Sequence, residues 1–151
     1  MSRKVIFAGF FPLWLGAQTN AVTAEPPAKL TVKAGRSAVA TLKFQLAPGY
    51  HTNSNTPSDE YLIPIRLTWE AAPLEVEAVE YPKGHLEKYG FSDKPLSVYS
   101  GVFEITTRLR APVSAPRGPR TVPAKLRYQA CTDTTCYAPK TLTLQVPVDI
   151  Q

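Results

Sequence analysis

The sequence lacks several features that define common functional classes. Its 151 residues include two cysteines, two histidines and one methionine, and they contain no run of basic residues. The absence of a basic run argues against nucleic-acid binding. Beyond the first 24 residues no apolar stretch approaches the ~20 residues of a membrane span, so we expect no membrane insertion of the mature chain. No segment shows the periodicity of an amphipathic helix.

The first 24 residues have the composition of a secretory signal peptide. Arg3 and Lys4 precede an apolar run over residues 5–15, and Val22-Thr23-Ala24 suits the last positions before a cleavage site. The alternative is a membrane anchor, for which the apolar run is short. We therefore predict cleavage after Ala24 and a mature domain of residues 25–151 with a charge of +3. The expected location is periplasmic or secreted, where cysteines normally pair.

Apolar and polar residues alternate in several short segments, which fifteen prolines and eight glycines punctuate. A period of two is typical of half-buried β-strands. The pattern predicts an all-β, antiparallel, immunoglobulin-like sandwich of six or seven strands between Lys29 and Ile150. The alternating segments are residues 40–46, 63–69, 103–110, 122–130 and 142–150, with a possible edge strand at 29–32. We expect the core to include Phe44, Trp69, Phe103 and Leu144.

Three other segments are less regular. Residues 74–81 have the composition of a strand, but Val76 and Val79 differ in parity, so the buried face is ambiguous. Residues 49–64 and 82–95 form long polar connections, and long connections in a compact domain are often functional. The second connection holds Tyr89 and Phe91, and aromatic residues in a polar loop need either a packing partner or a function.

The two cysteines lie between the last two predicted strands. Four residues separate Cys131 from Cys136, so the pair falls at the base of a hairpin-like connection at one rim of the sandwich. Such a pair cannot cross a core ~10 Å thick, so a disulfide between them would be local. Closing so small a loop would stabilise the fold by roughly 2 kcal/mol, which a domain of this size hardly needs.

The residues alone leave three interpretations of the cysteine pair open. The two thiols form an inert structural disulfide, bind a metal together with His51 or His85, or exchange with disulfides of partner proteins. No Cys-x-x-Cys or His-x-x-x-His spacing supports a metal site, and we predict neither a metal nor a cofactor.

Several stretches of the chain resemble one protein family. Tyr128-Gln129-Ala130-Cys131 and residues 136–141 surround the cysteines, and residues 49–55, 57–64 and 91–101 precede them in the same order as in the family. They resemble the N-terminal periplasmic domain of the DsbD-type thiol:disulfide interchange reductases over essentially the whole mature chain. The resemblance implies an immunoglobulin-like fold with a redox cysteine pair at one rim.

The resemblance also implies roles for individual residues. Cys136 matches the cysteine that forms a mixed disulfide with a partner, and Cys131 matches the one that resolves it. A cap loop covers the pair, with Phe91 as the best match to its aromatic residue and Tyr89 as the alternative. The remaining residues expected to line the site are Tyr50, His51 and Tyr128. Their alternative role is ordinary packing at strand ends.

Members of this family are protein-disulfide reductases that pass reducing equivalents from a membrane electron carrier to periplasmic partners. The partners implied here are disulfide isomerases and the thioredoxin-like proteins of cytochrome c maturation. The given chain ends at Gln151, without the membrane domain of the best-known members. We therefore expect a separate membrane electron donor. The alternative function is a secreted immunoglobulin-like binding domain with an inert structural disulfide.

Overall fold

The computed structural model describes residues 20–151 as a succession of β-strands without helices, which confirms the all-β prediction. The predicted basic and apolar parts of the signal peptide lie outside the described residues. No helix in the described part is long and apolar enough to cross a membrane. The strands are β1 (Val22–Ala24), β2 (Leu30–Val32), β3 (Ser37–Leu46), β4 (His51–Asn53), β5 (Arg66–Trp69), β6 (Glu75–Glu80), β7 (His85–Glu87), β8 (Leu96–Tyr99), β9 (Val102–Arg110), β10 (Gly118–Tyr128), β11 (Ala130–Cys131) and β12 (Lys140–Ile150).

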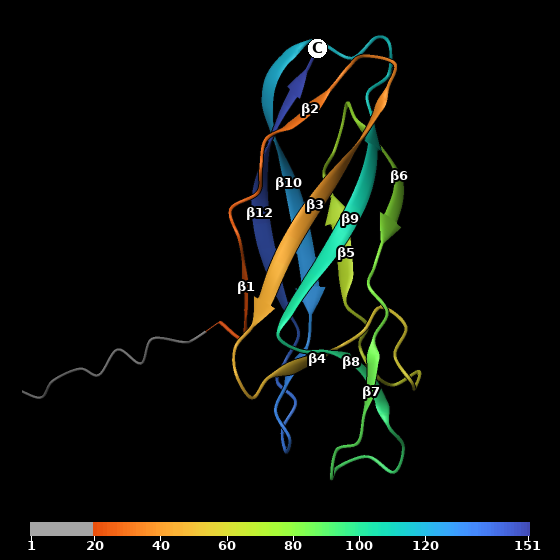
Figure 1. Cartoon of the computed structure of the whole chain (residues 1–151), viewed down its shortest axis with the longest axis vertical. Coiled ribbons are helices and arrows are strands. Elements are labelled where there is room, and N and C mark those ends of the chain that lie inside the picture. Colours follow the sequence, from red (N-terminus) through yellow and green to blue (C-terminus); the bar gives the residue numbers. More distant parts are fainter. Residues whose placement is uncertain (1–19) are drawn as a thin grey trace, which may run out of the picture.

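Three four-stranded sheets organise the chain (Figure 1). We call β1-β3-β9-β6 the front sheet, β2-β12-β10-β5 the back sheet and β11-β4-β8-β7 the rim sheet. The front and back sheets pack face to face as a sandwich, and the rim sheet lies at the end of the sandwich opposite the C terminus. Neighbouring strands run antiparallel except β2 and β12, which are parallel. The predicted edge strand at 29–32 is β2.

The core lies between the front and back sheets. Each long strand turns alternate residues inward, as in β12, where Leu144, Val146, Val148 and Ile150 are buried. Phe44 and Phe103 stack in the middle of the core with ring centroids 5.4 Å apart. Three of the predicted core residues are thus confirmed.

Trp69 is the exception among the predicted core residues, because it is only partly buried at the edge of the core. Its indole N–H donates a hydrogen bond of 3.1 Å to Thr107 Oγ1, and Thr107 is buried. The bond connects the back sheet to the front sheet and satisfies the polar end of the indole ring.

A β-bulge in β6 explains the parity conflict of residues 74–81. The register of β6 against β9 shifts between Val76 and Ala78, so one extra residue lies in β6. Val76 therefore pairs with Leu109 and Val79 with Thr107, two residues that both point into the core. The extra residue returns Val79 to the face of Val76, which a strict period of two excludes.

Strand β1 includes the residues directly before the predicted cleavage site. Val22 pairs with Leu46 and Ala24 with Phe44, and Val22 is fully buried. Cleavage after Ala24 would remove this edge strand and uncover β3. The packed domain thus includes residues that we assigned to the signal peptide, while cleavage itself stays a prediction.

Candidate functional site

The cysteines close the tip of the β10–β12 hairpin. Cys131 ends β11, and its sulfur is bonded to that of Cys136 at 2.08 Å. The Thr132 amide donates to the Thr135 carbonyl at 2.7 Å inside the loop, and the Tyr137 amide donates to the Ala130 carbonyl at 2.9 Å on its other side. The backbone is therefore fixed on both sides of the disulfide. The local disulfide expected for such a pair is present.

The two cysteines differ sharply in exposure. Cys131 is only 1% exposed, whereas Cys136 belongs to the exposed part of the loop. Strand β11 accounts for this difference, because it pairs with β4 and places Cys131 opposite His51. Cys136 is therefore the more accessible of the two cysteines.

An aromatic stack lies next to the buried cysteine. The ring of His51 stacks on Tyr89 with centroids 4.0 Å apart, and Tyr89 stacks on Phe91 at 5.5 Å. Exposure increases outward through the stack, from 3% for His51 and 7% for Tyr89 to 45% for Phe91. Tyr89, the alternative in the prediction, is thus the inner ring, and Phe91 is the outer one.

Strand β7 interrupts the predicted connection of residues 82–95, and residues 88–95 connect β7 to β8. We call residues 88–95 the cap. Its inner side is held by a small hydrophobic cluster separate from the main core, formed by Tyr89, Leu96 and Val98 with Leu62 against them. Gly84 directly before β7 permits close packing, because a Cβ there would lie 2.3 Å from Ser97 Oγ. On its other side the cap borders a cavity of about 270 Å³ that Phe91 helps to line. The cap is therefore firmly packed at its base and loosely packed at its tip.

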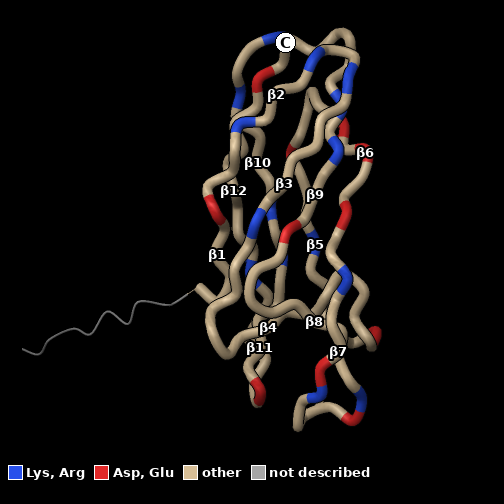
Figure 2. The backbone as a smooth tube through the Cα atoms, viewed as in Figure 1, with Lys and Arg blue, Asp and Glu red and all other residues tan. Residues whose placement is uncertain are grey.

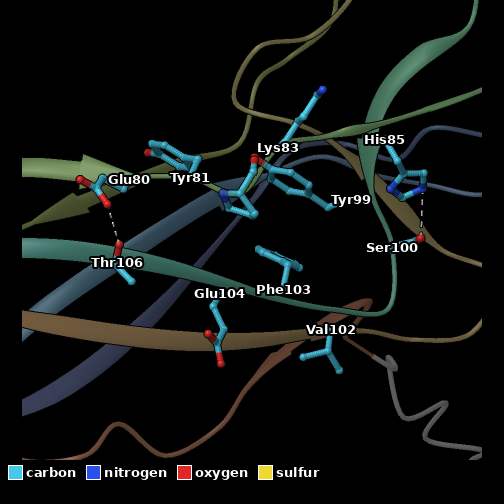
Figure 3. Close-up of a pocket in the computed structure, with 11 residues that line it drawn as sticks. Glu80, Tyr81, Lys83, His85, Tyr99, Ser100, Val102, Phe103, Glu104 and Thr106 are labelled. Atoms are coloured by element: carbon cyan, nitrogen blue, oxygen red, sulfur yellow. Dashed lines mark hydrogen bonds between the residues drawn. The ribbon is translucent and has the colours of Figure 1, made fainter.

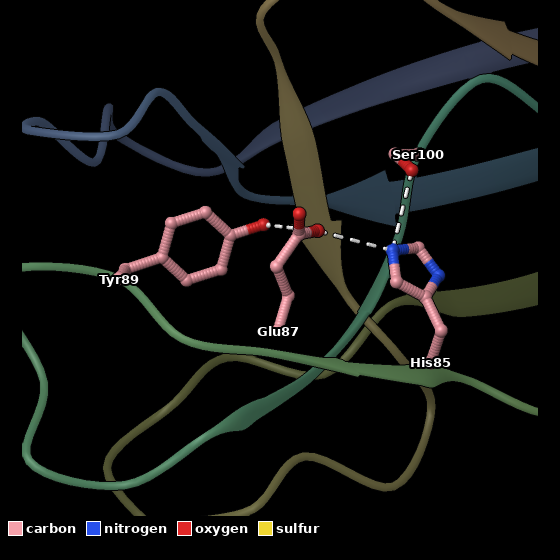
Figure 4. Close-up of polar contacts among 4 residues, drawn as sticks. All are labelled: His85, Glu87, Tyr89 and Ser100. Carbon is pink, nitrogen blue, oxygen red and sulfur yellow. Dashed lines mark hydrogen bonds and ion pairs between the residues drawn. The ribbon is translucent and has the colours of Figure 1, made fainter.

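A short chain of polar contacts extends outward from Tyr89 (Figure 4). The Tyr89 hydroxyl donates to Glu87 Oε2 at 3.1 Å, and His85 Nε2 lies 3.2 Å from the same carboxylate and 3.3 Å from Ser100 Oγ. A hydrolytic triad needs the carboxylate and the serine on opposite ring nitrogens. Here both contact Nε2, so these side chains do not form such a triad; they connect Tyr89 to β7 and to Ser100. No motif in the sequence marks Glu87 as a residue of this site.

The two remaining predicted site residues lie in different surroundings. Tyr50 is partly buried and packs at a tilt against Tyr137, with ring centroids 6.2 Å apart, so it supports the segment after Cys136. Tyr128 is 3% exposed and belongs to the main core. Burial raises the pKa of its hydroxyl. The structure therefore places His51 opposite Cys131 and connects Tyr89 and Phe91 to His51 through ring stacking. Tyr50 packs on Tyr137 beside Cys136, and Tyr128 lies in the main core.

The charge around the disulfide is acidic. Asp133 is the one charged residue between the cysteines, and Figure 2 shows an acidic position in the loop below β11. The negative charge of Asp133 acts to raise the pKa of both His51 and Tyr89, so it favours the protonated form of each. Because a neighbouring negative charge disfavours a thiolate, this position of Asp133 disfavours ionisation of the reduced cysteines. No group of three or more candidate metal ligands occurs within residues 20–151.

A larger hollow of about 600 Å³ lies away from the cysteines, on the outer surface where the front sheet meets β7 (Figure 3). Glu80 and Glu104 line one part of it, and Lys83 and His85 line another. Thr106 Oγ1 contacts Glu80 Oε2 at 3.5 Å within the hollow. Neither cysteine contributes to the lining, so this hollow is separate from the disulfide.

These features define a disulfide between one buried and one exposed cysteine, next to a stack of aromatic rings. A sequence model of the family described as "Thiol:disulfide interchange protein DsbD, N-terminal" matches residues 18–147. The chain belongs to this family. Membership of the DsbD N-terminal family implies a role in thiol:disulfide interchange, and the recognition made from the cysteine motif is confirmed.

Solved structures agree with the family assignment at the level of the fold. The reduced DsbD N-terminal domain of Neisseria meningitidis is 19% identical, with a TM-score of 0.51, and the match covers 77% of this chain and 82% of that one. The N-terminal periplasmic domain of ScsB from Proteus mirabilis is 16% identical, with a TM-score of 0.52, over 83% of this chain and 46% of that one. A search of curated proteins gave no significant match.

The stretches that resemble DsbD converge on the rim sheet. Residues 49–55 supply β4, and residues 91–101 supply the end of the cap and β8. Hydrogen bonds connect them, since Ser54 Oγ lies 2.8 Å from Ser97 Oγ and the Tyr99 hydroxyl donates to Asn55 Oδ1 at 2.9 Å. Their sequence motifs therefore correspond to one continuous structural unit around the disulfide.

Proposed function

We propose that this domain passes two electrons at a time from a membrane electron donor to thioredoxin-like partner proteins, by exchange of the Cys131–Cys136 disulfide. The unequal exposure of the two cysteines supports this proposal most directly. An inert structural disulfide needs no accessible sulfur, whereas exchange requires one sulfur that a partner can reach and a second one close behind it. Cys136 is exposed and Cys131 is buried against β4.

In the electron-donating half of the cycle both cysteines are thiols. The Cys136 thiolate attacks one sulfur of the partner's disulfide, a bond forms between the two proteins, and the partner's other sulfur leaves as a thiolate and takes up a proton. The thiol of Cys131 then loses its proton and attacks Cys136 Sγ. The mixed disulfide breaks, the Cys131–Cys136 bond forms, and the partner leaves as a dithiol carrying two electrons.

The electron-accepting half of the cycle reverses these steps with a different partner. A thiolate of the membrane electron donor attacks Cys136 Sγ, because that sulfur belongs to the exposed cysteine. Cys131 is released as a thiolate and protonated, and the donor's second thiol resolves the mixed disulfide. The domain is then a dithiol again and the donor carries a disulfide.

The proposed setting is the bacterial periplasm. The predicted signal peptide supports export, and membership of the DsbD N-terminal family supports a protein-disulfide reductase that serves disulfide isomerases or cytochrome c maturation. The similar domain of ScsB is described as periplasmic. An oxidising compartment contains the disulfide-bonded partners that such a reductase needs.

Trapping of the mixed disulfide tests the roles of the two cysteines. Reduced Cys131→Ala protein, mixed with a disulfide-bonded thioredoxin-like protein, should accumulate a covalent complex through Cys136, because the thiol that resolves it is missing. Reduced Cys136→Ala protein should form little complex, because Cys131 is buried. The double variant controls for non-specific disulfides, and non-reducing gel electrophoresis measures the product. Equal trapping by both single variants would contradict the assigned roles.

The redox potential of the pair separates exchange from an inert disulfide. Equilibration with glutathione should give a potential in the range of exchanging proteins. A potential far below about −300 mV is typical of structural disulfides. A potential far below about −300 mV would therefore favour the alternative function, a binding domain with an inert disulfide.

A further inference from the structure

His51 is buried where the cap meets the cysteine hairpin. It stands opposite Cys131 in the β4–β11 pair, and its ring is stacked on Tyr89 of the cap. The residue is 3% exposed, and its Nε2 atom has no hydrogen-bond partner among the described residues. A neutral imidazole tolerates this environment. A protonated one has two N–H donors and a positive charge to satisfy, which burial makes costly.

Charged and titratable groups face His51 from three neighbouring segments. They are Glu87 and His85 of β7, Tyr89 of the cap and Asp133 of the cysteine loop. Burial has the largest influence and lowers the pKa of His51, while Glu87 and Asp133 raise it and His85 lowers it further. Tyr89 stays neutral, because burial and its hydrogen bond to Glu87 raise the pKa of its hydroxyl.

We propose that His51 is a pH-sensitive positioning residue for the cap: the neutral imidazole, stacked on Tyr89, holds the cap closed, and the protonated imidazole favours an open cap. The proposal rests on the proposed function, because the cap matters only if the disulfide exchanges. The stack supports it directly, since His51 is the ring on which Tyr89 and then Phe91 are layered.

The direction of the pH effect follows from linkage. An open cap exposes His51 to water, so its pKa returns toward the ordinary value of about 6.5. In the closed cap the pKa is lower. The open form therefore binds more protons at acidic pH, and the closed form is fully favoured above about pH 6.5 and loses stability as the pH falls below that value.

Titration of the oxidised protein by nuclear magnetic resonance tests the starting condition. The chain has two histidines, and the resonances that are missing in His51→Phe identify those of His51. We expect His51 to titrate below the ordinary histidine pKa of about 6.5. Tyr89→Ala should raise the pKa of His51, because it removes the ring that covers the imidazole. A His51 pKa at or above about 6.5 in the unchanged protein would overturn the proposal.

A reduction assay tests the consequence. A water-soluble phosphine reduces the Cys131–Cys136 disulfide of the original protein and of His51→Phe, which keeps a stacking ring without a titrating group. The rate of the original protein is divided by the rate of His51→Phe, which cancels the pH dependence of the phosphine itself. This ratio should stay constant above pH 7 and rise by about twofold or more between pH 7.5 and pH 5.5. A ratio that stays flat to pH 5.5 would overturn the proposal.

The two proposals fail in different ways. Trapping through Cys136 is measured at neutral pH and does not depend on titration of His51. A flat rate ratio with normal trapping removes the role of His51 and leaves the exchange function intact. If His51→Phe does not fold, as shown by its circular dichroism, the titration of His51 in the original protein and in Tyr89→Ala decides the question alone.

Discussion

The sandwich body and the rim sheet bury their residues in different ways. Along β3 and β12 of the body, buried apolar residues alternate with more exposed ones, so each strand contributes one face to a common core. In the rim sheet the polar strand β4 is buried along its whole length, and Ser54 directly after it is buried too. The body is therefore stabilised by the burial of apolar surface, whereas the rim buries polar and aromatic groups around the disulfide.

Because of this difference, the stability of the fold depends mainly on the body, and the reactivity of the disulfide depends mainly on the rim. A rim that packs polar groups through specific hydrogen bonds and ring stacks can rearrange locally without loss of the core, since regions with few apolar contacts open at low free energy. The cap illustrates the point, with its small cluster of Tyr89, Leu96 and Val98 and a cavity beside its tip. Substitutions in the two regions should therefore have separable effects.

The largest effect is expected in the body. Phe44→Ala removes a fully buried ring that stacks on Phe103, and the resulting cavity should lower the free energy of unfolding by about 3–5 kcal/mol. Chemical denaturation followed by circular dichroism measures the change. The disulfide-exchange rate of the remaining folded protein should be almost unchanged. A large change in that rate without loss of stability would show that body and rim are not separable.

Removal of β1 should have the next largest effect. A chain that starts at Glu25 lacks Val22, which is fully buried, and the ladder bonds to β3. Compared with a chain that starts at Gln18, it should be less stable by about 2–3 kcal/mol, the value for burial of one aliphatic side chain with some loss of pairing. Denaturation of the two forms, each prepared separately, measures the difference.

The N terminus of the exported protein completes this test. Mass spectrometry of the periplasmic form should find one start residue. A start at Glu25 would confirm our cleavage prediction and mean that the mature domain folds without β1. A start upstream of Val22 would contradict that prediction and agree with the pairing of β1 and β3.

The body could be predicted from sequence because its physical signal is local. Burial of one face produces a period of two, and this period located β3, β9, β10 and β12. The bulge in β6 was hidden, because one extra residue reverses the parity of everything after it. Strand β1 was missed because small and apolar residues near an N terminus fit a signal peptide as well as a short edge strand.

The rim could not be predicted from the same signal. His51, Thr52 and Asn53 are polar, so they have the composition of a loop, and only the pairing of β4 with β8 and β11 explains their burial. Family resemblance pointed to the cysteines, which form the disulfide, and to a cap whose role at the disulfide stays a prediction. It ranked Phe91 above Tyr89, although Tyr89 is the ring in contact with His51, because the order of rings in a stack depends on tertiary packing.

A smaller effect is expected from Phe91→Ala at the tip of the cap. The side chain is 45% exposed, so its loss should lower stability by only about 1 kcal/mol, well below the cost of Phe44→Ala. It removes the outer ring of the stack and should speed alkylation of the reduced cysteines by a small reagent. A loss of 3 kcal/mol or more with unchanged alkylation would make Phe91 a core residue and contradict its role in the cap.

The smallest effect is expected from Asp133→Asn in the cysteine loop. The substitution removes the one negative charge between the cysteines, so the reduced Cys136 thiol should ionise at a slightly lower pH. An exposed charge in water shifts such a pKa by only a few tenths, which corresponds to about a twofold faster alkylation near pH 7.5. The rates are compared in a Cys131→Ala background, so that a single thiol reacts.

Two controls make this small difference interpretable. Asp149→Asn removes the same charge at the opposite end of β12 and should leave the rate unchanged. Raising the salt concentration to 1 M should reduce the effect of Asp133→Asn, because the Debye length falls to about 3 Å. The pH is kept above 7, where protonation of His51 does not contribute because burial lowers its pKa. An equal acceleration by both aspartate variants would mean that net charge, not the position of Asp133 beside the disulfide, controls the reactivity of Cys136.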